Sequence, residues 1–219
     1  MLKFTINSTT LITLLKTKRD YFERIFCVAD CLYVYEHLIE EEILIRPDLD
    51  VERLFTYMGK EIKTLGIDEK EINLCLEERS KEFNVSRIDV GSILCARKTK
   101  TPLLTDDYVE RLLAEKEGIA PIWTTAFMLG LHHKNMLDFN EFLDDVIRGR
   151  CLWLNSKIVS QLRILADREN INAIIDLMEG REINKKIELF LKHALIRKTP
   201  TGFDILCKNL IEMIGYLER

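Results

Sequence analysis

The stretch LKFTINSTTLITLLKTK, residues 2–18, decides the fold. Its first residues alternate apolar and polar side chains, which predicts a β-strand. Ser8 and Thr9 can then cap a helix that continues to about Lys18. A strand that leads directly into a helix is the building unit of a parallel α/β sheet.

The same alternation continues along the chain. Short apolar runs at 31–35, 101–105 and 119–123 predict three more strands. Helical spacing of apolar residues predicts one helix over 51–65, ended by Gly66, and Ser86 with Asp89 forms a capping box that opens another. Other helices are predicted over 37–45, 68–82, 106–118 and 124–133. Strands that alternate with helices favour a parallel sheet with helices on both faces.

The C-terminal third has no strand signal. Helices are predicted there over 139–147, 156–166, 171–178, 182–196 and 203–217. We therefore predict a three-layer α/β domain, with a short parallel sheet flanked by helices, over residues 1–135. Residues 136–219 are predicted to be a helical extension that packs on this domain or on a partner.

Composition excludes several classes of protein. With 47% hydrophobic and 31% charged residues, the chain of 219 residues is not disordered as a whole. The net charge of −4 excludes a dominant basic field, although a local basic patch remains possible. No apolar run approaches the roughly 20 residues that span a bilayer, so no membrane association is expected. Six cysteines without a C-x-x-C pair indicate reduced thiols and a cytoplasmic location.

Acidic side chains recur where predicted strands end or where the next helix begins. Asn7 follows the first strand, the run Glu40 to Glu42 follows the second, and Asp89, Asp106 and Asp107 come later. Carboxyl ends of parallel strands share one edge, so these groups could share one pocket and bind a hard cation such as Mg²⁺ or Mn²⁺. The alternative is structural: Asp89 and Asp106 would stabilise helix N-termini, and the glutamate run would be a solvated helix face.

Four segments resemble the PIN domain, the metal-dependent ribonuclease fold found in toxins of toxin–antitoxin pairs. They are TINSTTLITLL (5–15), YEHLIEEEI (35–43), DVGSILCA (89–96) and LLTDDYVERLLA (103–114). The resemblance covers roughly residues 1–170. It implies an endoribonuclease with Mg²⁺ or Mn²⁺ as cofactor. The two last predicted helices could bury their apolar stripes against the core, or against an antitoxin-like protein or a second copy of the chain. The catalytic residues that the resemblance implies are Glu41, Asp89, Asp106 and Asp107. The same four residues, together with Asn7, would be the metal ligands. The supporting residues would be Ser8, Glu40, Thr105 and Thr124.

Two residues depart from the family pattern. Asn7 stands where the family has Asp, and Trp123 stands where it has Gly. An amide oxygen can coordinate a metal but brings no charge, so the alternative is a catalytically degenerate PIN-like protein that binds RNA or a protein partner. Contacts to an RNA backbone are predicted for Arg97, Lys98 and Lys100. The alternative, which base rates favour, is a solvated helix C-terminus, where basic residues are common.

Overall fold

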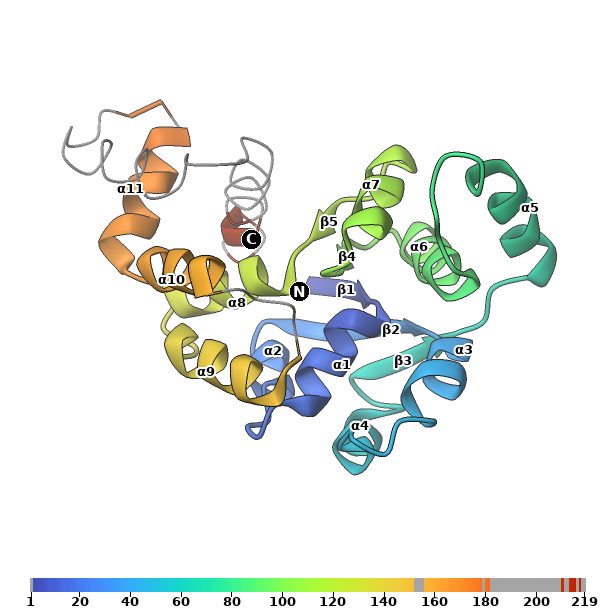
Figure 1. Ribbon diagram of the computed structural model, residues 1–219, viewed down its shortest axis with the longest axis horizontal. Coiled ribbons are helices and arrows are strands. Elements are labelled where there is room, and N and C mark those ends of the chain that lie inside the picture. Colours follow the sequence, from blue (N-terminus) through green and yellow to red (C-terminus); the bar gives the residue numbers. More distant parts are fainter. Residues whose placement is uncertain are drawn as a thin grey trace. The chain divides into compact units, whose positions relative to one another are not determined.

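The computed structural model of the chain describes residues 2–151, 156–178, 180–181, 210, 213–215 and 217. Strands and helices alternate in the first part of the chain, and helices alone follow (Figure 1). The strands are β1 Leu2–Ile6, β2 Ala29–Tyr35, β3 Ile62–Leu65, β4 Leu103–Leu104 and β5 Pro121–Ile122. The helices are α1 Ser8–Lys16, α2 Phe22–Phe26, α3 Glu36–Leu38, the π-helix η1 Ile39–Ile43, α4 Val51–Tyr57, α5 Glu69–Arg79, α6 Arg87–Thr99, α7 Tyr108–Lys116, α8 Thr124–His133, α9 Phe139–Gly149, α10 Ser156–Leu165 and α11 Arg168–Met178.

The strands form one parallel sheet in the order β3-β2-β1-β4-β5. The chain moves outward from β1 through β2 to β3, and then returns to the other side of β1 to form β4 and β5. The direction of travel therefore reverses between β1 and β4. In open parallel sheets, such a switch point is where ligands bind, beyond the carboxyl ends of the strands.

Helices cover both faces of this sheet, as predicted. Right-handed crossovers place the helices before the reversal and those after it on opposite faces. Accordingly α1 and α4 lie on one face and α6 and α7 on the other (Figure 1). Leu32, Val34 and Tyr35 of β2 are completely buried, which requires cover on both faces.

Helix α6 packs very closely on β2. A Cβ atom at Gly91 would lie 2.4 Å from the ring carbons Cδ1 and Cε1 of Tyr35. The absence of a side chain at Gly91 therefore sets the separation of helix and sheet at this point.

The single helix predicted over 51–65 is wrong. Helix α4 ends at Tyr57, Gly59 adopts a φ of +78°, and β3 begins at Ile62. Ile62 pairs with Leu32 of β2 and is completely buried, so pairing at the sheet edge outweighs the helical spacing of the apolar residues. The other predicted strands are confirmed, although β4 and β5 shorten to two residues each.

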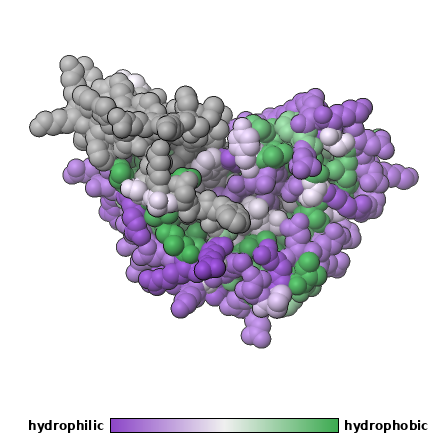
Figure 2. Space-filling model, viewed as in Figure 1, coloured by the Kyte–Doolittle hydropathy of each residue, from purple (hydrophilic) through white to green (hydrophobic). Residues whose placement is uncertain are grey.

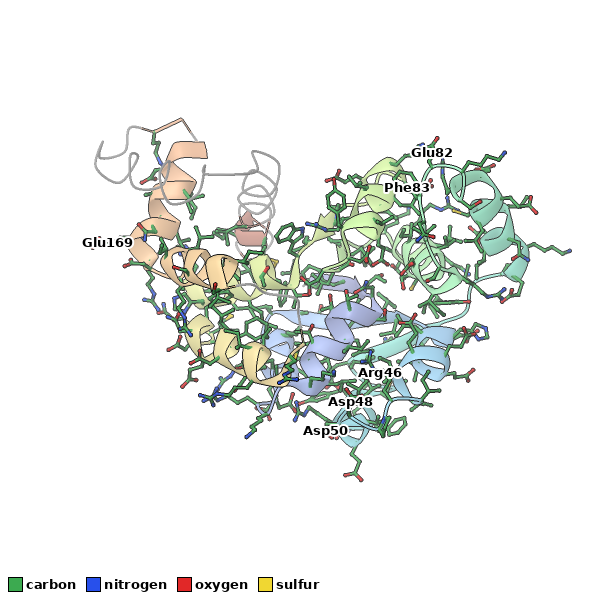
Figure 3. All side chains as sticks on the ribbon, in the orientation of Figure 1. Arg46, Asp48, Asp50, Glu82, Phe83 and Glu169 are labelled. Atoms are coloured by element: carbon green, nitrogen blue, oxygen red, sulfur yellow. The ribbon has the colours of Figure 1, made fainter. Side chains whose placement is uncertain are left out.

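Ion pairs and scattered apolar side chains occupy the surface. The visible face is mainly hydrophilic, with scattered hydrophobic residues (Figure 2). Lys116 of α7 pairs with Glu82 and lies 5.5 Å from the centroid of the Phe83 ring (Figure 3). On the other side of the sheet, Lys16 of α1 pairs with Asp48 at 2.7 Å (Figure 3). These pairs join neighbouring segments rather than forming a patch of one sign.

The chain divides into two compact units, residues 1–124 and 125–219. Nearly all of α8 belongs to the second unit, whereas the sequence predicted a division at 135. Within that unit, Gly130 of α8 approaches Met213 so closely that a Cβ atom at Gly130 would lie 2.9 Å from Met213 Cγ. The helix predicted over 182–196, and most of the one over 203–217, lie outside the described residues. No described helix has the length and apolar character needed to cross a membrane.

Candidate functional site

The switch point between β1 and β4 is lined by polar side chains that are almost completely buried. Asn7 follows β1 and is 1% exposed, while Thr105 follows β4 and is fully buried. The Asn7 backbone N–H donates to the Leu104 carbonyl at 3.1 Å, which holds the two strand ends together. All of these residues belong to the first compact unit.

The side-chain amide of Asn7 forms hydrogen bonds through both its oxygen and its nitrogen. Its Oδ1 accepts from the Thr10 backbone N–H at 3.1 Å and from the Thr9 hydroxyl at 2.9 Å, and so caps α1. Its Nδ2 donates to Thr105 Oγ1 at 2.8 Å and to Glu110 Oε2. The amide therefore joins the start of α1 to a carboxylate on α7.

Glu110 is the acidic residue at the centre of this cluster, and it is fully buried. Its Oε2 accepts from Thr105 Oγ1 at 2.6 Å as well as from Asn7. Its Oε1 is buried with no hydrogen-bond partner among the described residues. Burial, and then the negative charge of Asp89, raise the pKa of Glu110 well above its usual range.

Sequence analysis did not single out Glu110. The available signal was its place on α7, because Glu110 shares one face with Leu113 and Ala114, which are both completely buried. A glutamate on the apolar face of an amphipathic helix is unusual, and marks a buried carboxyl group.

Asp89 and Asp107 lie within electrostatic range of Glu110. The charges of both raise the pKa of Glu110, and burial followed by the charge of Asp107 raises the pKa of Asp89. Each also serves a helix. Asp89 Oδ2 accepts from the Ser86 backbone N–H at 2.7 Å in the predicted capping box, and Asp107 Oδ1 accepts from the Glu110 backbone N–H at 2.8 Å.

Asp106 points toward a different set of partners. Its Oδ1 accepts from the Thr124 backbone N–H at 3.2 Å, and its own N–H donates to Thr9 Oγ1 at 3.2 Å. Its Oδ2 is buried without a partner in the part of the chain that the structure describes. Burial raises the pKa of Asp106 to about 6, against the opposing effects of the Thr124 hydrogen bonds and the Arg111 charge.

Arg111 supplies a positive charge that acts on the two aspartates. Its guanidinium lies 3.9 Å from the centroid of the Trp123 ring, and its Nε donates to the Asp107 carbonyl at 3.3 Å. Burial lowers the pKa of Arg111 to about 10, and the neighbouring charges of Asp106 and Asp107 oppose that shift.

Glu40 and Glu41 are not brought into this cluster. Both lie on η1 with exposed side chains, and His37 Nδ1 is 3.9 Å from Glu40 Oε2 and 3.7 Å from Glu41 Oε1. The switch point lies between β1 and β4, whereas η1 follows β2. Ser8 is buried in the first turn of α1, and the Thr124 hydroxyl pairs with Thr10 Oγ1 at 2.8 Å.

The three predicted RNA contacts lie at the far end of α6 from Asp89. Eight residues of helix, about 12 Å, separate Asp89 from Arg97. Arg97 pairs with Glu71 at 2.7 Å and with Glu117 at 3.3 Å, and Lys98 Nζ donates to the Gly66 carbonyl at 3.5 Å. Arg97, Lys98 and Lys100 thus lie at the opposite end of α6 from Asp89, and their contact with RNA stays a prediction.

The donor chemistry of the cluster suits a hard cation, but its side chains do not converge. Asp89, Asp106, Asp107 and Glu110 each use one oxygen for a structural hydrogen bond, and two of the remaining oxygens are buried without partners. Nevertheless, among the described residues no group of three or more His, Cys, Asp or Glu side chains is placed to hold a metal ion. Comparison with known proteins adds no assignment, since no family model, curated protein or solved structure matches the chain.

Proposed function

We propose that the protein is a PIN-like, metal-dependent endoribonuclease whose site is formed by Asp89, Asp107 and Glu110 at the switch point. One observation carries this proposal: Glu110 is fully buried, and its pKa is raised by that burial and by the negative charges of Asp89 and Asp107. A buried carboxyl group whose pKa is strongly raised by burial and by neighbouring charges is typical of functional sites. A divalent cation would relieve the repulsion among the three carboxylates.

Each residue of the site has a separate task. Asp89, Asp107 and Glu110 would hold Mg²⁺ or Mn²⁺ only after their side chains turned toward one another, because they do not converge in this structure. Asn7 and Thr105 orient Glu110 through their hydrogen bonds. Asp106 is a positioning residue, because its carboxylate holds the backbone of Thr124 beside the strand ends. When bound, the cation would supply an attacking hydroxide and stabilise negative charge on the phosphate.

The second candidate is a degenerate PIN-like protein that binds RNA or a protein partner without cleavage. It is favoured by the hydrogen bond from the Asn7 amide to Glu110. That amide satisfies one carboxylate oxygen without adding charge, and so weakens the attraction for a cation. The same candidate is supported by the carboxylates of Asp89 and Asp107, which accept hydrogen bonds from helix N-termini and do not converge on one metal position among the described residues.

Calorimetry with Mn²⁺ and an RNA cleavage assay separate the two candidates. For a nuclease, the parent takes up Mn²⁺ and cleaves RNA, and Asp107→Asn and Glu110→Gln each lower Mn²⁺ affinity at least about tenfold. Glu41→Gln is the matched control, since it removes an exposed carboxylate outside the cluster. A parent that neither binds Mn²⁺ nor cleaves RNA would rule out the nuclease.

A further inference from the structure

Two aromatic rings and a guanidinium form a row beside the carboxylate cluster. Tyr108 and Arg111 are three residues apart on α7 and therefore share a helix face. The guanidinium carbon of Arg111 lies 5.6 Å from the centroid of the Tyr108 ring and 3.9 Å from that of Trp123, which follows β5. Both distances lie within the range of cation–π contacts.

The row begins in the protein interior and ends in solvent. Arg111 is only 7% exposed, and its Nη1 is buried without a hydrogen-bond partner within the described residues. Tyr108, in contrast, is 56% exposed. A buried cation thus supports an aromatic ring that has much of its surface open to water, directly after Asp107 in the chain.

We propose that Tyr108, supported by Arg111, is a stacking platform for a base of a single-stranded nucleic acid, bound beside Asp107. This inference rests on the proposed function and specifies its substrate class. Bases of single strands stack on exposed aromatic rings, whereas the bases of a duplex already stack on one another. The platform therefore selects an unpaired base next to the carboxylates.

The charges around the platform give this mode of binding a distinctive salt dependence. Asp106 and Asp107 lie beside Arg111, while Arg97 and Lys98 are engaged at the far end of α6. Phosphate contacts by lysine and arginine make affinity fall steeply with salt. Binding that depends on stacking should instead change little as salt rises, because salt also screens the repulsion from the aspartates.

The test measures fluorescence anisotropy of labelled 12-nucleotide oligoadenylate in EDTA, so that metal-dependent cleavage does not contribute. The probes for comparison are an abasic strand of the same length and a duplex. The parent should prefer the single strand to both, and Tyr108→Leu should lower that affinity about tenfold. Tyr108→Phe should retain it, and raising salt from about 0.1 to about 0.4 M should change it less than about threefold.

Phe55→Leu provides the matched control, because Phe55 is 55% exposed on α4, which leads to the opposite edge of the sheet. This variant should bind as the parent does. Equal affinity of the parent and Tyr108→Leu for oligoadenylate, or equal affinity of the parent for the abasic strand, would overturn the platform. Neither result depends on Mn²⁺ uptake or on cleavage, so the experiment can refute the stacking platform without refuting the nuclease, and the reverse.

Discussion

The side-chain amide of Asn7 donates a hydrogen bond to the buried carboxyl group of Glu110, at the switch point between β1 and β4. The same asparagine caps α1, so one side chain links a strand end, a helix start and the most deeply buried acid of the cluster. An aspartate of the same shape could still cap α1, but it could not donate to Glu110. The identity of residue 7 therefore decides whether Glu110 faces a donor or a second carboxylate.

Asn7→Asp should destabilise the metal-free protein and increase its affinity for Mn²⁺ relative to the parent. Without metal, two buried carboxylates in contact should lower the free energy of unfolding by roughly 1–3 kcal/mol at neutral pH. Urea unfolding with and without Mn²⁺ measures both effects. Asn73→Asp, an exposed position on α5, is the control and should change neither. Unchanged stability and no gain in Mn²⁺ affinity would place residue 7 outside the site.

Glu110→Gln should make the protein relatively more stable as pH rises. A carboxyl group whose folded-state pKa is raised contributes stability below its unfolded pKa, here 4.5, and that contribution is lost as pH rises toward the folded value. Glutamine keeps the acceptor oxygen and cannot ionise. Urea unfolding of parent and variant between about pH 5 and about pH 8 should therefore show a growing advantage for the variant. A constant difference across this range would contradict the raised pKa.

Asp106→Asn should show the same sign, over a pH window that ends near 6. The pKa of Asp106 rises from 3.8 to about 6, so the parent loses stability relative to the variant between these values. The full difference corresponds to about 3 kcal/mol. Asparagine retains an oxygen that can accept from Thr124, so the strand ends stay joined. Parallel pH profiles of parent and variant would refute a raised pKa at this site.

Gly91→Ala should destabilise the first unit, although alanine is the better helix former. Its Cβ would meet the rigid Tyr35 ring at 2.4 Å, and overpacking of this kind costs about 1–3 kcal/mol. Gly215→Ala is the control, because a Cβ built there meets no described atom within 4 Å outside its own helix backbone. That variant should be neutral or slightly stabilising. Equal denaturant midpoints for Gly91→Ala and the parent would mean that α6 does not pack so closely on β2.

The pattern of apolar residues predicted most of the fold because a strand buries every second side chain, whereas a helix buries side chains three or four residues apart. It failed at β3, where helical spacing from Val51 onward continued into residues that pair with β2. The spacing of apolar residues along the chain does not reveal that Ile62 pairs with Leu32 in a neighbouring strand. Long-range pairing decided the structure of that segment.

The site was predictable to the extent that it depends on strand ends. Asn7, Asp106 and Asp107 follow β1 and β4, so their gathering at one edge follows from the parallel sheet alone. Glu41 was included because it follows β2, but the switch point lies one strand away. Glu110 was missed because its burial depends on the way α7 faces the sheet, which only the packed structure reveals.

The capping role of Asn7, Asp89 and Asp107 has an evolutionary consequence. Each begins or secures a helix, so its replacement weakens folding whether or not the chain still performs any chemistry. Selection for a stable fold would preserve these polar groups in a descendant that had abandoned turnover. Glu110, which caps no helix, is free of that constraint, and its retention or loss among descendants would follow their chemistry more closely.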